Sequence, residues 1–134
     1  MSAGKLDELG RKFFESQDRR KGGPDPDLCA SSYVARIGSN PPMNLAGHDA
    51  FGKAFYGGFP DIYHTVEDTV ADDSKVAVVF MLRGTHTQDF MGIPPTQKKI
   101  EVGAIVVLTV VDGRVTELRG QFDQSGMMQQ LGVG

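Results

Sequence analysis

The strongest candidate for chemistry in this sequence is the carboxylate of Asp123, which stands between two kinds of pattern. Strand-like residues over 114–123 lead up to it, and a short amphipathic run typical of a helix follows over 124–131. In apolar surroundings the pKa of a carboxyl group rises toward neutrality, so the group can act as a base and then as an acid. An Asp at such a junction can instead accept amide hydrogens as a helix cap, and the sequence leaves both roles open.

Two more polar side chains share a strand face with Asp123. Side chains alternate between the two faces of a strand, so Arg119, Gln121 and Asp123 point to the same side of the predicted sheet. An Arg beside Asp123 would lower the pKa of its carboxyl group and weaken it as a base. The three groups could contact a ligand, direct water in a hydrolytic site, or form an ordinary salt bridge at the sheet edge.

The other candidate acid/base groups are the three histidines, His48, His64 and His86. Their spacing is too irregular to predict a metal site. We expect His86 near the mouth of a cavity, His64 on the surface or at a strand edge, and His48 in a structural role near a helix start. Phe59 and Phe90 belong to a large set of apolar residues, part of which could line a pocket for a flat hydrophobic ligand.

Length and composition narrow the class of protein. A chain of 134 residues fits one domain, 1–134, and its net charge of −3 gives no reason to expect nucleic acid as a partner. No apolar run approaches the roughly 18 residues that cross a membrane, so we expect a cytoplasmic protein with no membrane partner. The single cysteine, Cys29, allows no internal disulfide and is expected to be a buried structural thiol.

Three helices are predicted ahead of the strands. Apolar residues at helical spacing indicate an amphipathic helix over 6–20, which the Gly- and Pro-rich segment 21–27 must end. The pair Asp25-Pro26 suits the start of a short second helix that continues over 28–32. A third helix is indicated over 47–56, where glycines and a proline then close it.

The period of the pattern then changes to that of strands. Four runs of alternating or β-branched residues cover 63–70, 75–86, 98–111 and 114–123, and Asp112-Gly113 is a strong hairpin turn signal. Four such strands predict a curved antiparallel sheet, and the helices can cover only one of its faces. The expected fold class is therefore α+β, with the sheet wrapping the N-terminal helices.

Five blocks of the sequence, in order, together resemble the SnoaL-like polyketide cyclases, also called predicted ester cyclases. These blocks span 58–61, 84–87, 90–96, 112–117 and 123–132. The resemblance implies the cone-shaped α+β fold of nuclear transport factor two and ketosteroid isomerase. It also implies a homodimer built on the outer face of the sheet.

In characterised members of this family, an intramolecular aldol condensation closes the last ring of an aromatic polyketide methyl ester without metal or cofactor. One aspartate at the end of the last long strand exchanges protons with the substrate, and that aspartate matches Asp123. Tyr33 and Arg36 precede a loop where family members often place a Tyr and a His facing the cavity. The resemblance therefore makes these two residues candidate ligand contacts, and it implies no cofactor.

The chain departs from the family at three positions. Members commonly carry Arg where this chain has Val79, and His or Arg near the position of Leu108. They commonly carry Trp where this chain has Arg119. Two hypotheses follow from the resemblance and these departures. One is a cyclase- or isomerase-type enzyme that acts on a small hydrophobic carbonyl compound with Asp123 as acid/base. The other is a non-catalytic module of the same fold for small-molecule binding or dimerisation. Epoxide hydrolase-like hydrolysis through Arg119, Gln121 and Asp123 is a third, weaker hypothesis.

Overall fold

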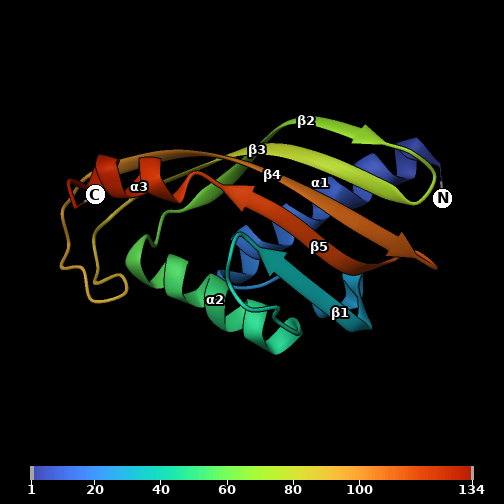
Figure 1. The fold of residues 1–134 in the computed structure, drawn as a ribbon, viewed down its shortest axis with the longest axis horizontal. Helices are drawn as coiled ribbons and strands as arrows, with labels where there is room; N and C mark the ends of the chain where they lie inside the picture. Colours follow the sequence, from blue (N-terminus) through green and yellow to red (C-terminus); the bar gives the residue numbers. More distant parts are fainter. Residues whose placement is uncertain (1, 134) are drawn as a thin grey trace.

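A helical layer covers one face of a curved five-stranded sheet in the computed structural model, which describes residues 2–133 (Figure 1). The elements are, in chain order, α1 (Ala3–Arg20), the 3-10 turn η1 (Pro26–Leu28), β1 (Cys29–Ile37), α2 (Leu45–Gly58), β2 (Tyr63–Ala71), β3 (Lys75–Thr85), β4 (Lys99–Val111), β5 (Arg114–Phe122) and α3 (Gln124–Leu131). The strand order is β1-β5-β4-β3-β2. The predicted α+β cone class is confirmed.

The predicted second helix is wrong, and a strand takes its place. Asp25 caps only the single turn η1, where its carboxylate accepts the amide hydrogen of Asp27 over 2.9 Å. The chain is extended from Cys29 onward although Ser31 and Ser32 have little preference for strands. Pairing with β5 overrides the local pattern, and β1 runs parallel to that strand. The sheet is therefore mixed, with every other neighbouring pair antiparallel.

The predicted hairpin between the last two strands of the chain is confirmed. Asp112 and Gly113 both have positive φ, at 52° and 77°, and they join β4 to β5. Such a turn matches the right-handed twist of the flanking strands, and Asp-Gly tolerates it because Gly has no Cβ and Asp visits this region more readily than most residues. The turn fixes the register that carries β5 to α3.

The helices are positioned by their apolar faces. Ser2 caps α1 by accepting the Lys5 amide hydrogen at 3.2 Å, and Lys21, with φ of 53°, ends it. The helix packs against β2 and β3, and its buried face carries Leu6, Leu9, Phe13, Phe14, Ser16 and Gln17. Two of these buried residues are polar, and both lie in the last turns of the helix. The end of α1 therefore brings polar groups to an otherwise apolar layer.

Two apolar clusters fill the cone. The larger one joins α1 to the middle of the sheet and includes Phe13, Phe14, Tyr33, Val78, Leu108 and Leu118. The smaller one joins α2 and α3 to the other end of the sheet and includes Phe55, Phe59, Phe90, Val102, Met127 and Leu131. Residues of both clusters border the cavity described below, so the cavity lies where the two clusters meet.

The opposite face of the sheet carries exposed and half-buried apolar side chains. Ile105 on β4 is 55% exposed, and Val79, Met81 and Val107 on the same face are half-buried. This face is where the family resemblance predicts a dimer. Val79 and Leu108 are the two positions where the chain has an apolar residue in place of the polar one common in the family. Val79 lies on this outer face, whereas Leu108 is fully buried in the core.

Two expectations from composition concern the cysteine and the membrane. Cys29 is buried, and burial raises the pKa of its thiol to about 12, which fits a structural role. In the part of the chain from residue 2 to residue 133, none of the helices combines the length and apolar character needed to cross a membrane. The cytoplasmic location stays a prediction.

Candidate functional site

An apolar cavity opens between α1, α2 and the inner face of the sheet, and we call it the inner cavity. The empty space between its side chains is about 660 Å³, a figure that includes open solvent at its mouth. Its wall is mostly aromatic and aliphatic, with Phe14, Phe51, Phe55, Phe80, Leu82 and Val106 among the lining residues. The polar groups that border it are Gln17, His48, Tyr56, His64 and Gln121.

A histidine and a carboxylate meet at this wall. The Nδ1 atom of His64, on β2, lies 2.7 Å from Oδ1 of Asp18, on α1, and the side chain of His64 is only 10% exposed. The backbone N–H of His64 donates to Oδ2 of the same carboxylate over 2.9 Å, and the hydroxyl of Tyr56 donates to Oδ1 over 2.6 Å. Three donors thus hold the Asp18 carboxylate in place.

These contacts decide the charge of Asp18 and the orientation of the imidazole. Burial would raise the pKa of Asp18, but hydrogen bonds and charge from His64, with the hydroxyl of Tyr56, hold it below its ordinary value. The carboxylate is therefore ionised at neutral pH and accepts a proton-bearing Nδ1. The Nε2 atom of His64 has no protein partner within residues 2–133, so it is the ring nitrogen that remains for a ligand in the cavity.

A second imidazole borders the same cavity from α2. His48 is only 4% exposed, and its Nδ1 lies 2.8 Å from the hydroxyl oxygen of Tyr33, whose ring stacks against it. Burial lowers the pKa of His48 to about 4 and raises the pKa of Tyr33 well above its usual range. Both groups are therefore neutral at pH 7, in contrast to the ionised Asp18 nearby.

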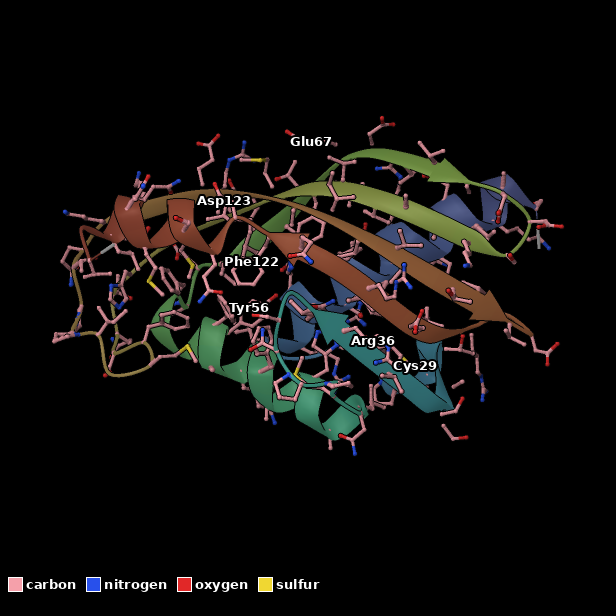
Figure 2. All side chains as sticks on the ribbon, viewed as in Figure 1. Cys29, Arg36, Tyr56, Glu67, Phe122 and Asp123 are labelled. Carbon is pink, nitrogen blue, oxygen red and sulfur yellow. The ribbon has the colours of Figure 1, made fainter. Side chains whose placement is uncertain are left out.

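Asp123 lies outside this arrangement. Its exposed side chain caps α3, with Oδ1 accepting the Gly126 amide hydrogen over 2.9 Å. It borders a separate depression, which we call the outer hollow, together with Arg36, Arg119 and Gln121. Figure 2 shows Phe122 and Tyr56 between the sheet and α2, with Asp123 on the other side of β5.

The comparison with protein families decides the relationship. The model of the SnoaL-like polyketide cyclases matches residues 10–131 of the chain. The chain belongs to the SnoaL-like polyketide cyclase family. No curated protein matches it significantly. The family assignment supports a cyclase- or isomerase-type role at a coarse level and leaves the particular chemistry to be established.

Several solved structures share the fold. IdmH, a candidate polyketide cyclase from Streptomyces antibioticus, is 28% identical with a TM-score of 0.82, over 96% of this chain and 99% of that one. A candidate SnoaL-like polyketide cyclase from Jannaschia sp. CCS1 is 21% identical with a TM-score of 0.84, over 98% and 94%. AclR, a candidate hydroxylase from Streptomyces galilaeus, is 20% identical with a TM-score of 0.87, over 99% and 88%. Proteins described with different chemistries therefore share this scaffold.

The three polar residues that the sequence predicts on one face of the last strand do lie on one side of the sheet. Arg119, Gln121 and Asp123 all border the outer hollow, and Gln121 also reaches the inner cavity. Within residues 2–133 no ion pair joins Arg119 to Asp123, so the salt bridge considered from the sequence is not formed. Arg36 pairs instead with Glu117, with 3.2 Å between Nε and Oε2.

The remaining predicted ligand contacts are buried. Phe59, Phe90 and His86 pack together in the smaller cluster, with 5.1 Å between the ring centroids of Phe59 and His86. Nδ1 of His86 accepts the Thr96 amide hydrogen at 3.2 Å. Tyr33 reaches the cavity only through His48, and none of these four predicted residues lines the cavity wall. Ligand binding by them stays a prediction.

Sequence reasoning missed the Asp18–His64 pair. His64 was expected at the surface or at a strand edge, and it does lie on the edge strand β2, but its side chain is largely buried. Asp18 and His64 are far apart in the sequence and meet only because α1 crosses β2. One signal was available: Phe14, Gln17 and Asp18 follow one another at helical spacing, which brings polar groups next to the apolar stripe of α1. No group of three or more metal-ligating side chains is found in residues 2–133.

Proposed function

We propose that this SnoaL-like protein catalyses enolisation-type chemistry, an aldol cyclisation or an isomerisation, on a small, flat, hydrophobic carbonyl compound. The observation that carries the proposal is the Asp18–His64 pair at the wall of an apolar cavity. An imidazole held by an ionised carboxylate is a general base, because the carboxylate fixes its tautomer and stabilises the imidazolium that forms.

The proton transfers follow from this geometry. Nε2 of His64 removes a proton from the carbon next to the substrate carbonyl; the C–H bond breaks and its electron pair moves to the carbonyl oxygen as an enolate. In an aldol cyclisation the enolate carbon then attacks a second carbonyl group of the same molecule. The new alkoxide takes the proton back from the imidazolium of His64, which leaves the enzyme unchanged.

Asp123 is the alternative base, supported by its match to the family aspartate. Its carboxylate is exposed and accepts a helix amide hydrogen, and it does not line the inner cavity. We therefore give the role of base to His64 and treat Asp123 as the competing assignment. The two residues lie in different depressions, so their variants separate the two mechanisms.

The test is deuterium exchange and ring closure on a panel of aromatic ketones and polyketide-like methyl esters, followed by NMR. We compare the wild type with His64→Gln, Asp18→Asn and Asp123→Asn. Loss of exchange in the first two variants with retention in the third supports the proposal. Loss in Asp123→Asn alone would return the role of base to Asp123.

A non-catalytic binding module is the second candidate, favoured by the apolar wall of the inner cavity and by the departures at Val79, Leu108 and Arg119. It predicts thermal stabilisation by members of the same panel, with no exchange above the rate in buffer. Hydrolysis at the outer hollow predicts turnover of an epoxide panel that depends on Asp123 and Arg119.

We also propose that the protein is a homodimer joined through the outer sheet face. The proposal is supported by the exposed Ile105 and by the half-buried apolar side chains beside it. Sedimentation analysis of the wild type and of Ile105→Glu tests it, because a charge at the centre of that face should give a monomer. A wild type that sediments as a monomer contradicts the proposal.

A further inference from the structure

The His48–Tyr33 pair has no part in the proton transfers above, yet it borders the same cavity. Its hydrogen bond fixes which nitrogen of His48 carries the proton. The hydroxyl of Tyr33 is buried, and Nδ1 of His48 is its hydrogen-bond partner in the described part of the chain. A buried O–H group needs an acceptor, so Tyr33 donates to Nδ1 and the proton of the neutral imidazole lies on Nε2.

The Nε2 atom of His48 is open to the cavity. It makes no hydrogen bond within residues 2–133, and the one buried, unpartnered side-chain polar atom found there belongs to His86, not to His48. The unpartnered nitrogen of His48 is therefore in contact with the space that the cavity offers to a ligand. It presents a single N–H donor in apolar surroundings.

We propose that the N–H of His48 binds the carbonyl oxygen of the substrate and stabilises the negative charge that this oxygen acquires, with Tyr33 as the residue that positions it. The inference rests on the proposed function, because it assigns the second half of the same reaction. His64 takes the proton from carbon, and His48 receives the charge that moves to oxygen. The substrate is thus a carbonyl compound whose oxygen can reach Nε2 of His48 on α2.

A neutral imidazole suits this role. Burial keeps the pKa of His48 near 4; the nearby carboxylate of Asp49 raises it and the nearby imidazole of His64 lowers it further. His48 therefore stays an uncharged donor at neutral pH and does not compete with His64 for the substrate proton. A donor fixed in an apolar site strengthens its hydrogen bond as the oxygen becomes negative, which favours the transition state over the ground state.

The first test needs no activity. Long-range 1H–15N NMR of imidazole-labelled protein should show His48 as the neutral tautomer with the proton on Nε2 from pH 5.5 to pH 8. In Tyr33→Phe, which keeps the ring and loses the hydroxyl, the signals should shift toward a mixture of tautomers. A proton on Nδ1 in the wild type, or a charged ring at pH 6, overturns the inference.

The second test uses 1-tetralone, a flat ketone, and 1-naphthol, which mimics its enol. In His48→Leu, the exchange rate of 1-tetralone should fall roughly 100-fold, as expected for the loss of one oxyanion donor. The ratio of the dissociation constants of 1-tetralone and 1-naphthol should fall by a similar factor. His48→Gln, whose side-chain amide restores an N–H donor, should recover part of both and shows that loss of folding is not the cause. With carbonyl-labelled 1-tetralone, the 13C signal should move downfield on binding to the wild type and move less with His48→Leu.

The outcomes separate the two proposals. Exchange that depends on His64 but is unchanged in His48→Leu overturns the role of His48 and leaves the proposed function standing. Exchange that is unchanged in His64→Gln overturns the assignment of His64 as the base. The 13C chemical shift of bound 1-tetralone then tests the contact with His48 independently of the base. Equal carbonyl shifts in the wild type and His48→Leu contradict that contact directly.

Discussion

The inner cavity and the outer hollow each hold a carboxylate with a basic group nearby, but in different surroundings. In the cavity, Asp18 is half-buried and accepts hydrogen bonds from the backbone and side chain of His64 and from Tyr56. In the hollow, Asp123 is exposed and accepts one backbone amide hydrogen. The comparison teaches that two carboxylates of the same residue type differ in burial and in the number of hydrogen-bond donors around them, and our proposed function rests on that difference.

The most direct test of the difference between the cavity and the hollow is to replace each candidate base in turn. We expect His64→Gln to lower kcat for enolisation by about 1,000-fold, within the range that a general base contributes. Asp123→Asn should change kcat by less than about 3-fold, because its carboxylate lies outside the cavity. Steady-state deuterium exchange measures both. Equal losses in the two variants would show that the cavity and the hollow act as one site.

A second prediction concerns the pH dependence that the cavity imposes on stability. The pKa of His48 is lowered to about 4 in the folded protein, whereas an unfolded His has a pKa of about 6.5. Between these values the unfolded chain binds the proton and the folded one does not. The contribution of His48 is therefore complete above about pH 6.5 and is lost as the pH falls toward 4, by roughly 3 kcal/mol in total.

Urea unfolding at several pH values between 4.5 and 7.5 checks this prediction. His48→Gln should flatten the fall in the free energy of unfolding on acidification, since its side chain does not titrate. Identical slopes for wild type and His48→Gln would contradict the burial of a neutral imidazole.

The third prediction concerns the carboxylate of Asp18, which holds the imidazole of His64 in place. Asp18→Asn should lower the free energy of unfolding by about 2 kcal/mol, because an amide cannot accept all the hydrogen bonds that the carboxylate accepts. The pKa of Asp18 is lowered in the folded state, so its ionic contribution is present above about pH 4 and is lost as the pH falls below that value. The difference between wild type and variant should therefore shrink in acid.

Asp61→Asn is the control for that experiment. Asp61 also accepts backbone and side-chain hydrogen bonds, from Thr85 at 2.7 Å and 2.9 Å, but it is exposed. We expect a smaller loss of stability and no loss of exchange activity. Chemical unfolding and deuterium exchange on the same samples measure the two effects. A larger loss in Asp61→Asn would show that burial is not what distinguishes Asp18.

The smallest expected effect concerns Asp123 as a helix cap. Asp123→Ala should cost about 1 kcal/mol, because the first turn of α3 loses the side chain that accepts the Gly126 amide hydrogen. Asp123→Asn should cost almost nothing, since Asn caps helices about as well as Asp. Thermal unfolding of the two variants measures the difference. Equal losses of stability would point to a role for the charge of Asp123.

The sequence predicts most of the fold because its signals there are local. Adjacent residues are enough to predict the alternating strands β2 to β5, the turn at Asp112-Gly113 and the possible cap at Asp123. The sequence does not predict β1, because its strand conformation depends on pairing with β5. Residues 29–37 carry no information about that distant part of the chain.

The candidate site was harder to predict for the same reason. Arg119, Gln121 and Asp123 attract attention because they alternate along one strand, whereas Asp18, Tyr56 and His64 come from α1, α2 and β2. Spacing in the sequence reveals nothing about a group assembled by the crossing of three elements. Only the packing of α1 on β2 brings them together.

The parallel pairing of β1 with β5 also affects how the protein is made. Leu118 and Phe122 on β5 form part of the cavity wall, and β5 pairs with a strand that leaves the ribosome about 80 residues earlier. During synthesis, α1 can pack on β2 and β3 before β5 emerges, whereas β1 has no neighbouring strand to pair with until then. The cavity wall is therefore complete only once β5 has been made, and a nascent chain paused before β5 should expose the unpaired edge of β1.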